Sequence, residues 1–276
     1  MAKHFKLRKD FSLMWEGKTL YRIEATEDIP CQKVHKGDIG GFVESEDNLS
    51  EDAWVFQEAK VYDDALVYGR ASVYGDAEVF GEAGVSGNAE VCWDAKVYGM
   101  AQVYGSAKVS MDARVFCGAP VSGDARVHGA ARVHEDARVF GNAEVYGTAE
   151  VSGGTWVYGD AIVCGYAKIF GGAQVFGNVI VSGNATVFGR AEVCGNSLVI
   201  GDAKISSTED YVVFKNFWSS GRHFTWTRSN NMWSVGCFYG TGEELVEKAY
   251  KDSKESGDNY KMFVDFVNEK ILKKEK

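Results

Sequence analysis

A six-residue hydrophobic period runs through the middle of this 276-residue chain. From Leu49 to Ile205 every sixth residue is a branched aliphatic, and 24 of these 27 positions are Val. Four positions later comes a small residue, which is Ala at 23 of 26 sites, and two positions after the aliphatic comes Gly at 19 of 26. Val favours an extended, half-buried backbone, and Gly before a polar residue favours a turn with positive φ. Each unit V-x-G-x-A-x therefore predicts a very short strand followed by a bend.

One such strand cannot bury its Val alone, so the units must stack. The unit resembles the hexapeptide repeat of left-handed parallel β-helices, [LIV]-x-x-x-[small]-x, in which three units make one triangular coil. This resemblance implies about nine coils over residues 49–204. At about 4.8 Å per stacked strand the prism is roughly 43 Å long. We expect an all-β solenoid, a left-handed parallel β-helix with a β-rich amino-terminal cap and a small α+β carboxyl-terminal domain.

A narrower resemblance lies at the two ends of the chain. The segments Tyr21–Ala25, Lys36–Glu46, Asn48–Ser50 and Gly236–Thr241 are similar to an uncharacterised bacterial and bacteriophage branch of hexapeptide proteins. Members of that branch are often labelled acyltransferases, and related prisms are acyltransferases, carbonic-anhydrase-like enzymes or inert scaffolds. The resemblance implies a bacteriophage or prophage origin and leaves these functions open.

We divide the chain into an amino-terminal cap (1–42), the β-helix (43–206) and a carboxyl-terminal domain (207–276). In the cap, apolar residues alternate loosely, as they do in short strands. The carboxyl-terminal domain has a capping box at Thr241–Glu244, which predicts a helix running to about Ser253. A second helix is predicted by helical spacing from Tyr260 to Ile271, and three strands are expected at Tyr211–Phe214, His223–Thr227 and Met232–Val235.

Charge and composition narrow the function classes. The net charge is −9, and residues 43–206 alone carry −11, which argues against binding to a nucleic acid polymer. No apolar run is long enough for a transmembrane helix, and the basic start lacks the apolar core of a secretory signal. The six Cys form no CxxC pair. We therefore expect reduced thiols and a cytoplasmic protein, in the host-cell cytoplasm if a bacteriophage encodes it, with no membrane partner.

The residue after each aliphatic should point outward, so every eighteenth residue falls in one column of the prism surface. One column carries Tyr62, Phe80, Tyr98, Phe116, His134, Ser152, Phe170 and Phe188, and a second carries Ser50, Tyr68, Ser86, Tyr104, Ser122, Phe140, Tyr158 and Phe176. An aromatic ladder of this length exceeds what a monomer usually leaves in water. We predict a lateral interface through Tyr62, Phe80, Tyr98, Phe116, Phe170 and Phe188, in a homotrimer as in the family. The alternative is that the rings stack only to stiffen the coils.

Catalytic residues are sparse. His128 and His134 lie six residues apart and therefore on different faces, so neither a metal site nor a cofactor site is expected. In the family, acyltransferases place a catalytic His beside a loop that leaves the prism, whereas this repeat is uninterrupted. We therefore expect no enzyme. An acyltransferase that uses CoA, with His134 as general base, is the weaker alternative.

Two groups of residues are candidates for binding an anion. A basic belt carries Arg126, Arg132 and Arg138 on one coil, although these charges could also pair with Glu144 and Glu150 as a solvated band. The carboxyl-terminal domain gathers Arg222, His223, Trp226 and Trp233, which could stack on a nucleotide or simply form a core. The leading hypothesis is a non-catalytic binding or scaffold protein of bacteriophage type. It would sequester a small anionic metabolite or signalling nucleotide, or bind a host protein; a structural assembly module is the third alternative.

Overall fold

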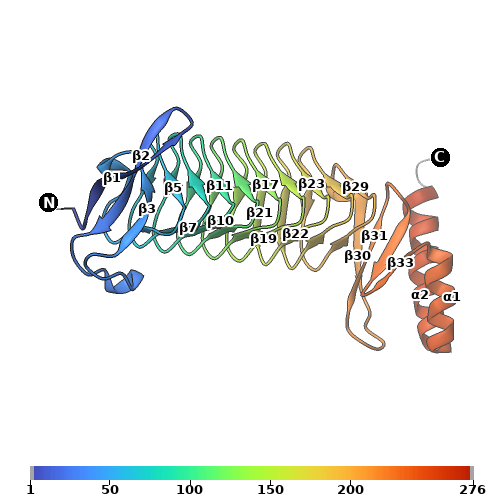
Figure 1. Ribbon diagram of the computed structural model, residues 1–276. Coiled ribbons are helices and arrows are strands. Elements are labelled where there is room, and N and C mark those ends of the chain that lie inside the picture. Colours follow the sequence, from blue (N-terminus) through green and yellow to red (C-terminus); the bar gives the residue numbers. More distant parts are fainter. Residues whose placement is uncertain (1–2, 274–276) are drawn as a thin grey trace.

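The computed structural model describes residues 3–273. It shows an elongated prism with a hairpin-bearing cap at the amino end and a small domain of sheet and helices at the carboxyl end (Figure 1). The prism has three faces, each a parallel sheet in which strands eighteen residues apart are neighbours. The chain is therefore a parallel β-solenoid of about nine turns, as the period predicts.

Face 1 continues the sheet of the amino-terminal cap. Its strands are β1 (Phe5–Trp15), β2 (Lys18–Ala25), β3 (Ile39–Val43), β5 (Lys60–Val61), β8 (Glu78–Val79), β11 (Lys96–Val97), β14 (Arg114–Val115), β17 (Arg132–Val133), β20 (Glu150–Val151), β23 (Lys168–Ile169), β26 (Thr186–Val187) and β29 (Lys204–Ile205).

Faces 2 and 3 lie wholly within the prism. Face 2 consists of β4 (Trp54–Val55), β7 (Ser72–Gly75), β10 (Glu90–Trp93), β13 (Lys108–Ser110), β16 (Arg126–Val127), β19 (Glu144–Val145), β22 (Ile162–Val163), β25 (Ile180–Val181) and β28 (Leu198–Val199). Face 3 consists of β6 (Leu66–Val67), β9 (Gly84–Val85), β12 (Gln102–Val103), β15 (Pro120–Val121), β18 (Arg138–Val139), β21 (Trp156–Gly159), β24 (Gln174–Gly177) and β27 (Glu192–Val193).

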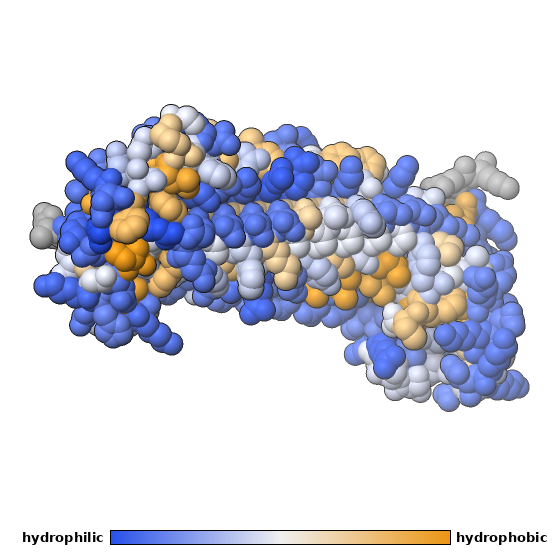
Figure 2. Space-filling model, viewed as in Figure 1, coloured by the Kyte–Doolittle hydropathy of each residue, from blue (hydrophilic) through white to orange (hydrophobic). Residues whose placement is uncertain are grey.

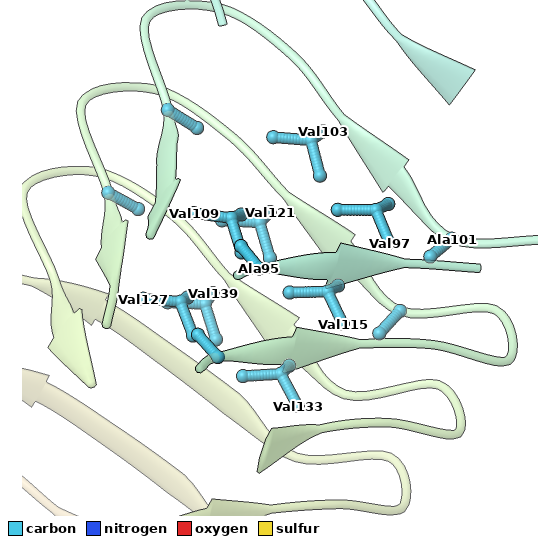
Figure 3. Packing of buried hydrophobic residues seen from close by; sticks show 14 of the residues in the cluster. Ala95, Val97, Ala101, Val103, Val109, Val115, Val121, Val127, Val133 and Val139 are labelled. Atoms are coloured by element: carbon cyan, nitrogen blue, oxygen red, sulfur yellow. The ribbon is translucent and has the colours of Figure 1, made fainter. Parts of the chain in front are cut away.

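The prism core is built almost entirely from the Val and Ala of the repeat. These side chains point inward from all three faces and are fully buried, as Figure 3 shows for Val109, Val115 and Val121 and their neighbours in adjacent coils. In-register pairing places each Val directly above the next, as in Val127 and Val145. Close packing of identical small side chains explains why the phase of the repeat is never broken.

The corners confirm the turn chemistry. All 19 Gly of the repeat have a positive φ, between +68° and +82°. The seven other residues at this position, among them Trp93 and Met111, also have a positive φ, between +55° and +64°. Gly is therefore favoured at the corner because it adopts this conformation without steric cost, although a minority of corners accept a side chain.

The two ends of the prism leave backbone groups without a neighbouring coil. Within the prism the coils are joined by parallel-strand hydrogen bonds, for example from the N–H of Arg126 to the carbonyl of Ala143 in the next coil at 2.9 Å. The outer edges of the first and last coils therefore present N–H groups and carbonyls that no further coil can bond. An uncapped edge of this kind would template aggregation.

Side-chain donors cap the amino-terminal edge. His4 Nε2 bonds the carbonyl of Ala53 at 3.0 Å, Arg22 donates to Gln57, Gln32 donates to Arg70, and Asn48 donates to both Asp63 and Ala65.

The cap itself differs from the expected short strands: β1 and β2 form one long antiparallel hairpin that projects beside face 1 (Figure 1). The sequence alternation there is loose because the pairing shifts register between Arg8 and Ser12.

Side-chain acceptors cap the carboxyl-terminal edge, with one acceptor for each face. The hydroxyl of Tyr211 accepts from the N–H of Cys194 at 3.1 Å, that of Thr225 from Leu198 at 2.9 Å, and that of Ser229 from Lys204 at 2.7 Å. The Tyr211 hydroxyl also donates to the carbonyl of Glu192 at 3.1 Å, so the carboxyl-terminal domain docks on the end of the prism by bonding backbone groups that stacking leaves open.

The carboxyl-terminal domain packs an antiparallel sheet between the prism and two helices (Figure 1). Its elements are β30 (Tyr211–Lys215), β31 (His223–Thr227), β32 (Met232–Val235), β33 (Phe238–Gly240), α1 (Gly242–Asp252), α2 (Lys254–Phe266) and a π-helical turn (Val267–Leu272). Short 3-10 turns lie at Pro30–Gln32, Glu46–Asn48 and Thr208–Asp210.

The starts of the two helices show which helix ends the local sequence predicts correctly. The Thr241 capping box is present, since Thr241 Oγ1 accepts from the N–H of Glu244 and Glu244 accepts in return. The second helix begins at Lys254, six residues before the predicted start, because Ser253 caps it. Its first turns are polar and contain Gly257, so they carry no apolar periodicity.

Candidate functional site

The aromatic column of face 1 is a stacked ladder. Tyr62, Phe80, Tyr98 and Phe116 stack with ring centroids 4.9–5.0 Å apart and planes within 2°. His134 continues the stack at 4.7 Å from Phe116. Beyond Ser152 the ladder resumes with Phe170 and Phe188, whose centroids lie 5.5 Å apart.

The amino-terminal hairpin covers the first rungs of this ladder. Tyr62 is only 3% exposed and is buried with Leu20 and Phe42, while Trp15 packs against the same cluster. Phe80, Tyr98, Phe116 and Phe188 are half-buried, and Phe170 is 40% exposed. Of the six residues predicted as a lateral interface, Tyr62 is therefore occupied by the chain itself, and the later rungs are the accessible ones.

A buried carboxylate ties the hairpin to the ladder. Glu78 accepts hydrogen bonds from Tyr62 OH at 3.0 Å and from Trp15 Nε1 at 3.3 Å, and its other oxygen lies 2.6 Å from Lys96 Nζ. Burial of Glu78 opposes ionisation, yet Lys96 and Tyr62 outweigh it and hold the pKa of this carboxyl below its usual range.

This pKa shift predicts acid sensitivity. Because the folded-state pKa of Glu78 lies below the unfolded value, its contribution to stability is present above about pH 4.5 and is lost as pH falls through the folded-state pKa. We expect Glu78→Gln to lower the unfolding free energy at pH 7 by about 1–3 kcal/mol and to flatten its decline toward pH 3. Denaturant unfolding at pH 7 and pH 3.5 measures both. Glu82→Gln, at an exposed corner, should follow the wild type, and an equally steep decline in Glu78→Gln would contradict the assignment.

The basic belt is distributed over three faces. Arg126 lies on face 2, Arg132 on face 1 and Arg138 on face 3, so the three guanidinium groups do not converge. The two acidic residues offered as their partners bond the histidines instead: His128 Nε2 lies 2.9 Å from Glu144 and His134 Nε2 lies 3.1 Å from Glu150. Among residues 3–273 none of the three arginines has an ion-pair partner within 4 Å.

On face 2 the belt lines a shallow groove. The groove, of about 380 Å³, is bordered by Lys108, Ser110, Arg126, His128 and Glu144. Lys108 is already bound to Glu90 at 2.6 Å and to Tyr74 at 3.1 Å, which raises the pKa of its ammonium group. Arg126 is thus the free cation of this groove within the described part of the chain.

His134, the weaker catalytic candidate, lies in a structural arrangement. Its ring is stacked on Phe116, and its Nε2 faces Glu150, whose pKa this contact lowers together with the charge of Lys168. His128 is on another face and stacks on Tyr146 at 4.9 Å. In the portion that the structure describes, no group of three or more His, Cys, Asp and Glu side chains could hold a metal ion.

A pocket in the carboxyl-terminal domain gathers charged and hydroxyl groups from several elements. It has a volume of about 280 Å³ and lies among the loop after β30, the turn between β32 and β33, and helices α1 and α2. The lining residues are Asn216, Ser219, Ser220, Arg222, Val235, Cys237, Phe238, Leu245, Lys248, Ala249, Asp252, Ser256 and Tyr260. We call it the carboxyl-domain pocket.

Two cations and one hydroxyl dominate the chemistry of the carboxyl-domain pocket. Arg222 and Lys248 are exposed and, over residues 3–273, neither forms an ion pair within 4 Å, although Asp252 also lines the pocket. Tyr260 is buried, and its hydroxyl accepts from Asn216 Nδ2 at 3.3 Å, so its own proton is available to a ligand. Burial, helped by the charge of Asp252, raises the pKa of Tyr260, which keeps this hydroxyl protonated at neutral pH.

The other predicted residues of this domain do not line the pocket. Trp226 and Trp233 are fully buried in the domain core, where Trp233 stacks on Phe214 at 5.8 Å and Trp226 donates to Asn231. His223 begins β31 opposite Lys215. Sequence reasoning missed Asn216, Lys248 and Tyr260, because they come from a loop and two helices and share no spacing that would mark them as one site.

An apolar patch on face 2 was also missed. Figure 2 shows apolar surface on the prism beside the carboxyl-terminal domain. On the last three strands of face 2 the residue before each Val is Ile162, Ile180 and Leu198, and Ile180 is 37% exposed. In sequence these residues look like ordinary repeat positions, so nothing distinguishes them until the coils are stacked.

These features define a parallel β-solenoid with a capping domain at each end. In comparisons with known proteins, a family model described as the YdcK beta solenoid repeat matches residues 173–189, which form one coil segment of the prism. No curated protein matches the chain. Over residues 3–273, no helix is long and apolar enough to cross a membrane.

Proposed function

We propose that this chain is a non-catalytic binding protein in which a rigid solenoid holds a pocket for a small anionic ligand. The carboxyl-domain pocket carries the proposal, since it presents Arg222, Lys248 and the Tyr260 hydroxyl to one volume. Within residues 3–273 neither cation forms an ion pair within 4 Å, and such guanidinium and ammonium groups favour phosphate or carboxylate, with which they form strong charge-assisted hydrogen bonds.

The apolar wall of the pocket indicates what else the ligand carries. Phe238, Val235 and Leu245 are among the lining residues, and Lys248 Nζ lies 5.4 Å from the Phe238 ring centroid. A ligand that combines a phosphate with a flat organic part suits this mixture of surfaces. A nucleotide is therefore the class we propose, in the bacteriophage or prophage setting that the resemblance at the chain ends implies.

Thermal-shift measurements with adenosine monophosphate and inorganic phosphate test this proposal. A ligand at 100 times its Kd stabilises the fold by about 2.7 kcal/mol, which gives a measurable rise in the unfolding temperature. We expect stabilisation of the wild type, loss of that stabilisation in Arg222→Ala, and no loss in Lys251→Ala. Lys251 is the control because it is a cation on α1, the helix that carries Lys248, and it pairs with Glu247 outside the pocket.

Two results would overturn the proposal. The first is the absence of any shift with anionic ligands, together with unchanged behaviour of Arg222→Ala. The second is turnover of acetyl-CoA that disappears in His134→Ala, which would favour the acyltransferase alternative.

The lateral interface is a second proposal, and the exposed part of the face 1 ladder favours it. Phe170 is 40% exposed, and the half-buried Phe188 and Phe116 lie on the same face. Exposed rings in a row favour association with a second copy. Light scattering that gives the mass of a trimer would support this assembly, and the mass of a monomer would remove it.

A further inference from the structure

The aromatic column of face 3 is interrupted at Ser122, directly before a run of three stacked rings. In three successive coils Phe140, Tyr158 and Phe176 stack with centroids 4.9 Å apart and planes 2° and 6° from parallel. One coil before Phe140 the same position is Ser122, and the coil before that carries Tyr104. Ser122 is therefore a missing rung between two aromatic rings.

The spacing of this gap matches the thickness of one planar ring. Two coil steps separate Tyr104 from Phe140, which corresponds to about 9.6 Å. A ring placed midway would lie about 4.8 Å from each neighbour, within the range of stacked aromatic pairs. Tyr104 is 45% exposed, so its ring is largely uncovered, whereas Tyr158, with rings on both sides, is half-buried.

The missing rung opens into a defined pocket. Its volume is about 240 Å³, and it is lined by Tyr104, Pro120, Ser122, Arg138, Phe140 and Trp156. We call it the Ser122 slot. Pro120 lies on β15 and Ser122 directly follows that strand, while Arg138 and Trp156 lie in register on the next two strands.

A cation stands at the rim of the slot. The guanidinium carbon of Arg138 lies 5.5 Å from the centroid of the Trp156 ring, and Trp156 itself is 41% exposed. Trp156 also meets Phe140 edge-on at 6.3 Å. The Arg138 guanidinium contacts the Trp156 ring, and within the described residues it forms no ion pair with an acidic side chain. Its N–H groups are therefore available to a ligand.

A second missing rung on the same face has different neighbouring side chains and no arginine at the position of Arg138. Ser86 separates Tyr68 from Tyr104 in the same column, but its neighbours are Gly84 and Gln102. The Gln102 side chain lies over Gly84, since a Cβ there would be 2.2 Å from Gln102 Oε1. This gap has a neutral amide in place of the Pro120 and Arg138 pair, and it serves as an internal control.

We propose that the Ser122 slot binds a planar aromatic ring that carries an anionic group. The ring completes the ladder between Tyr104 and Phe140, and a carboxylate or phosphate on it bonds the Arg138 guanidinium. The site is separate from the carboxyl-domain pocket, because its residues lie on face 3 in the middle of the prism.

Calorimetric titration of the full chain with 2-naphthoate tests the slot. The neutral 2-naphthamide is the matched ligand without the charge. We expect saturable binding of 2-naphthoate and at least tenfold weaker binding of 2-naphthamide. Ser122→Phe should abolish binding, because its ring fills the slot, and Arg138→Gln should weaken it at least tenfold.

Control variants make the result specific. Ser86→Phe adds the same ring two coils earlier in the same column and should leave the affinity for 2-naphthoate unchanged. Arg222→Ala, in the carboxyl-domain pocket, should also leave it unchanged. Ser122→Phe is expected to unfold no earlier than the wild type, because neighbouring coils already carry a ring at that position. Equal binding in the wild type and Ser122→Phe, equal loss in Ser86→Phe, or no binding by the wild type would overturn the proposal. Loss in Arg222→Ala alone would assign the ligand to the other pocket.

Discussion

Val127→Asp is expected to lower the unfolding free energy by at least about 3 kcal/mol and to make the middle coils of the prism accessible to protease. Val127 is fully buried on β16, in register with Val109 and Val145. A carboxyl group at this place meets only aliphatic side chains, so it loses its hydration and gains no partner. In a solenoid each coil depends on its neighbours, and the damage therefore spreads along the prism.

Thermal unfolding followed by circular dichroism, with limited proteolysis, measures this effect. The midpoint should fall by about 10 °C or more. Arg126→Asp introduces the same side chain one residue earlier on the same strand, where the side chain is exposed, and should shift the midpoint by far less. Similar losses in the two variants would contradict the placement of the repeat Val in the core.

A chain that ends after Ser206 is expected to aggregate at concentrations where the full chain stays monodisperse. Removing the carboxyl-terminal domain deletes the hydroxyl acceptors for the N–H groups of Cys194, Leu198 and Lys204, one on each face. Three parallel strand edges then become templates for another chain. Light scattering and sedimentation measure the outcome, and a monodisperse truncated chain would show that the edge needs no cap.

A point variant distinguishes the effect of one capping hydrogen bond from the effect of removing the whole domain. Thr225→Val removes the acceptor for Leu198 and keeps the shape of a buried side chain. We expect it to lower the unfolding free energy by about 1–3 kcal/mol and to leave the protein monodisperse.

The six-residue period of the sequence was sufficient to predict the prism. The Val of each repeat sets the strand and the core, and the residue two positions later sets the corner. Val at every sixth position is buried, and all 26 corner residues two positions later have positive φ. The covering of Tyr62 could not be predicted in the same way. It depends on the hairpin that brings Leu20 and Trp15 over face 1, and no local pattern states where a hairpin will dock.

The candidate sites were only partly visible in sequence. The sequence predicts Arg222 and Arg138 as anion-binding residues, but as members of a cluster and a belt whose residues lie apart in the fold. Arg222 instead joins Lys248 and Tyr260, which lie on helices far along the chain, and Arg138 joins a ring one coil away. Such sites arise from packing between elements, so spacing in the chain carries little information about them. The sequence shows that Ser122 interrupts the column of aromatic residues. Only the distance between coils and the pocket at Ser122 show that the interruption could hold a ring.

Isothermal titration of the full chain with adenosine monophosphate, followed by mass spectrometry of the recovered ligand, tests the proposal that the carboxyl-domain pocket binds a small anion without transforming it. The expected result is saturable binding, at least tenfold weaker in Arg222→Ala and unchanged in Lys251→Ala, with the nucleotide recovered intact. The absence of saturable binding, equal affinity in Arg222→Ala, or a chemically altered nucleotide would contradict it.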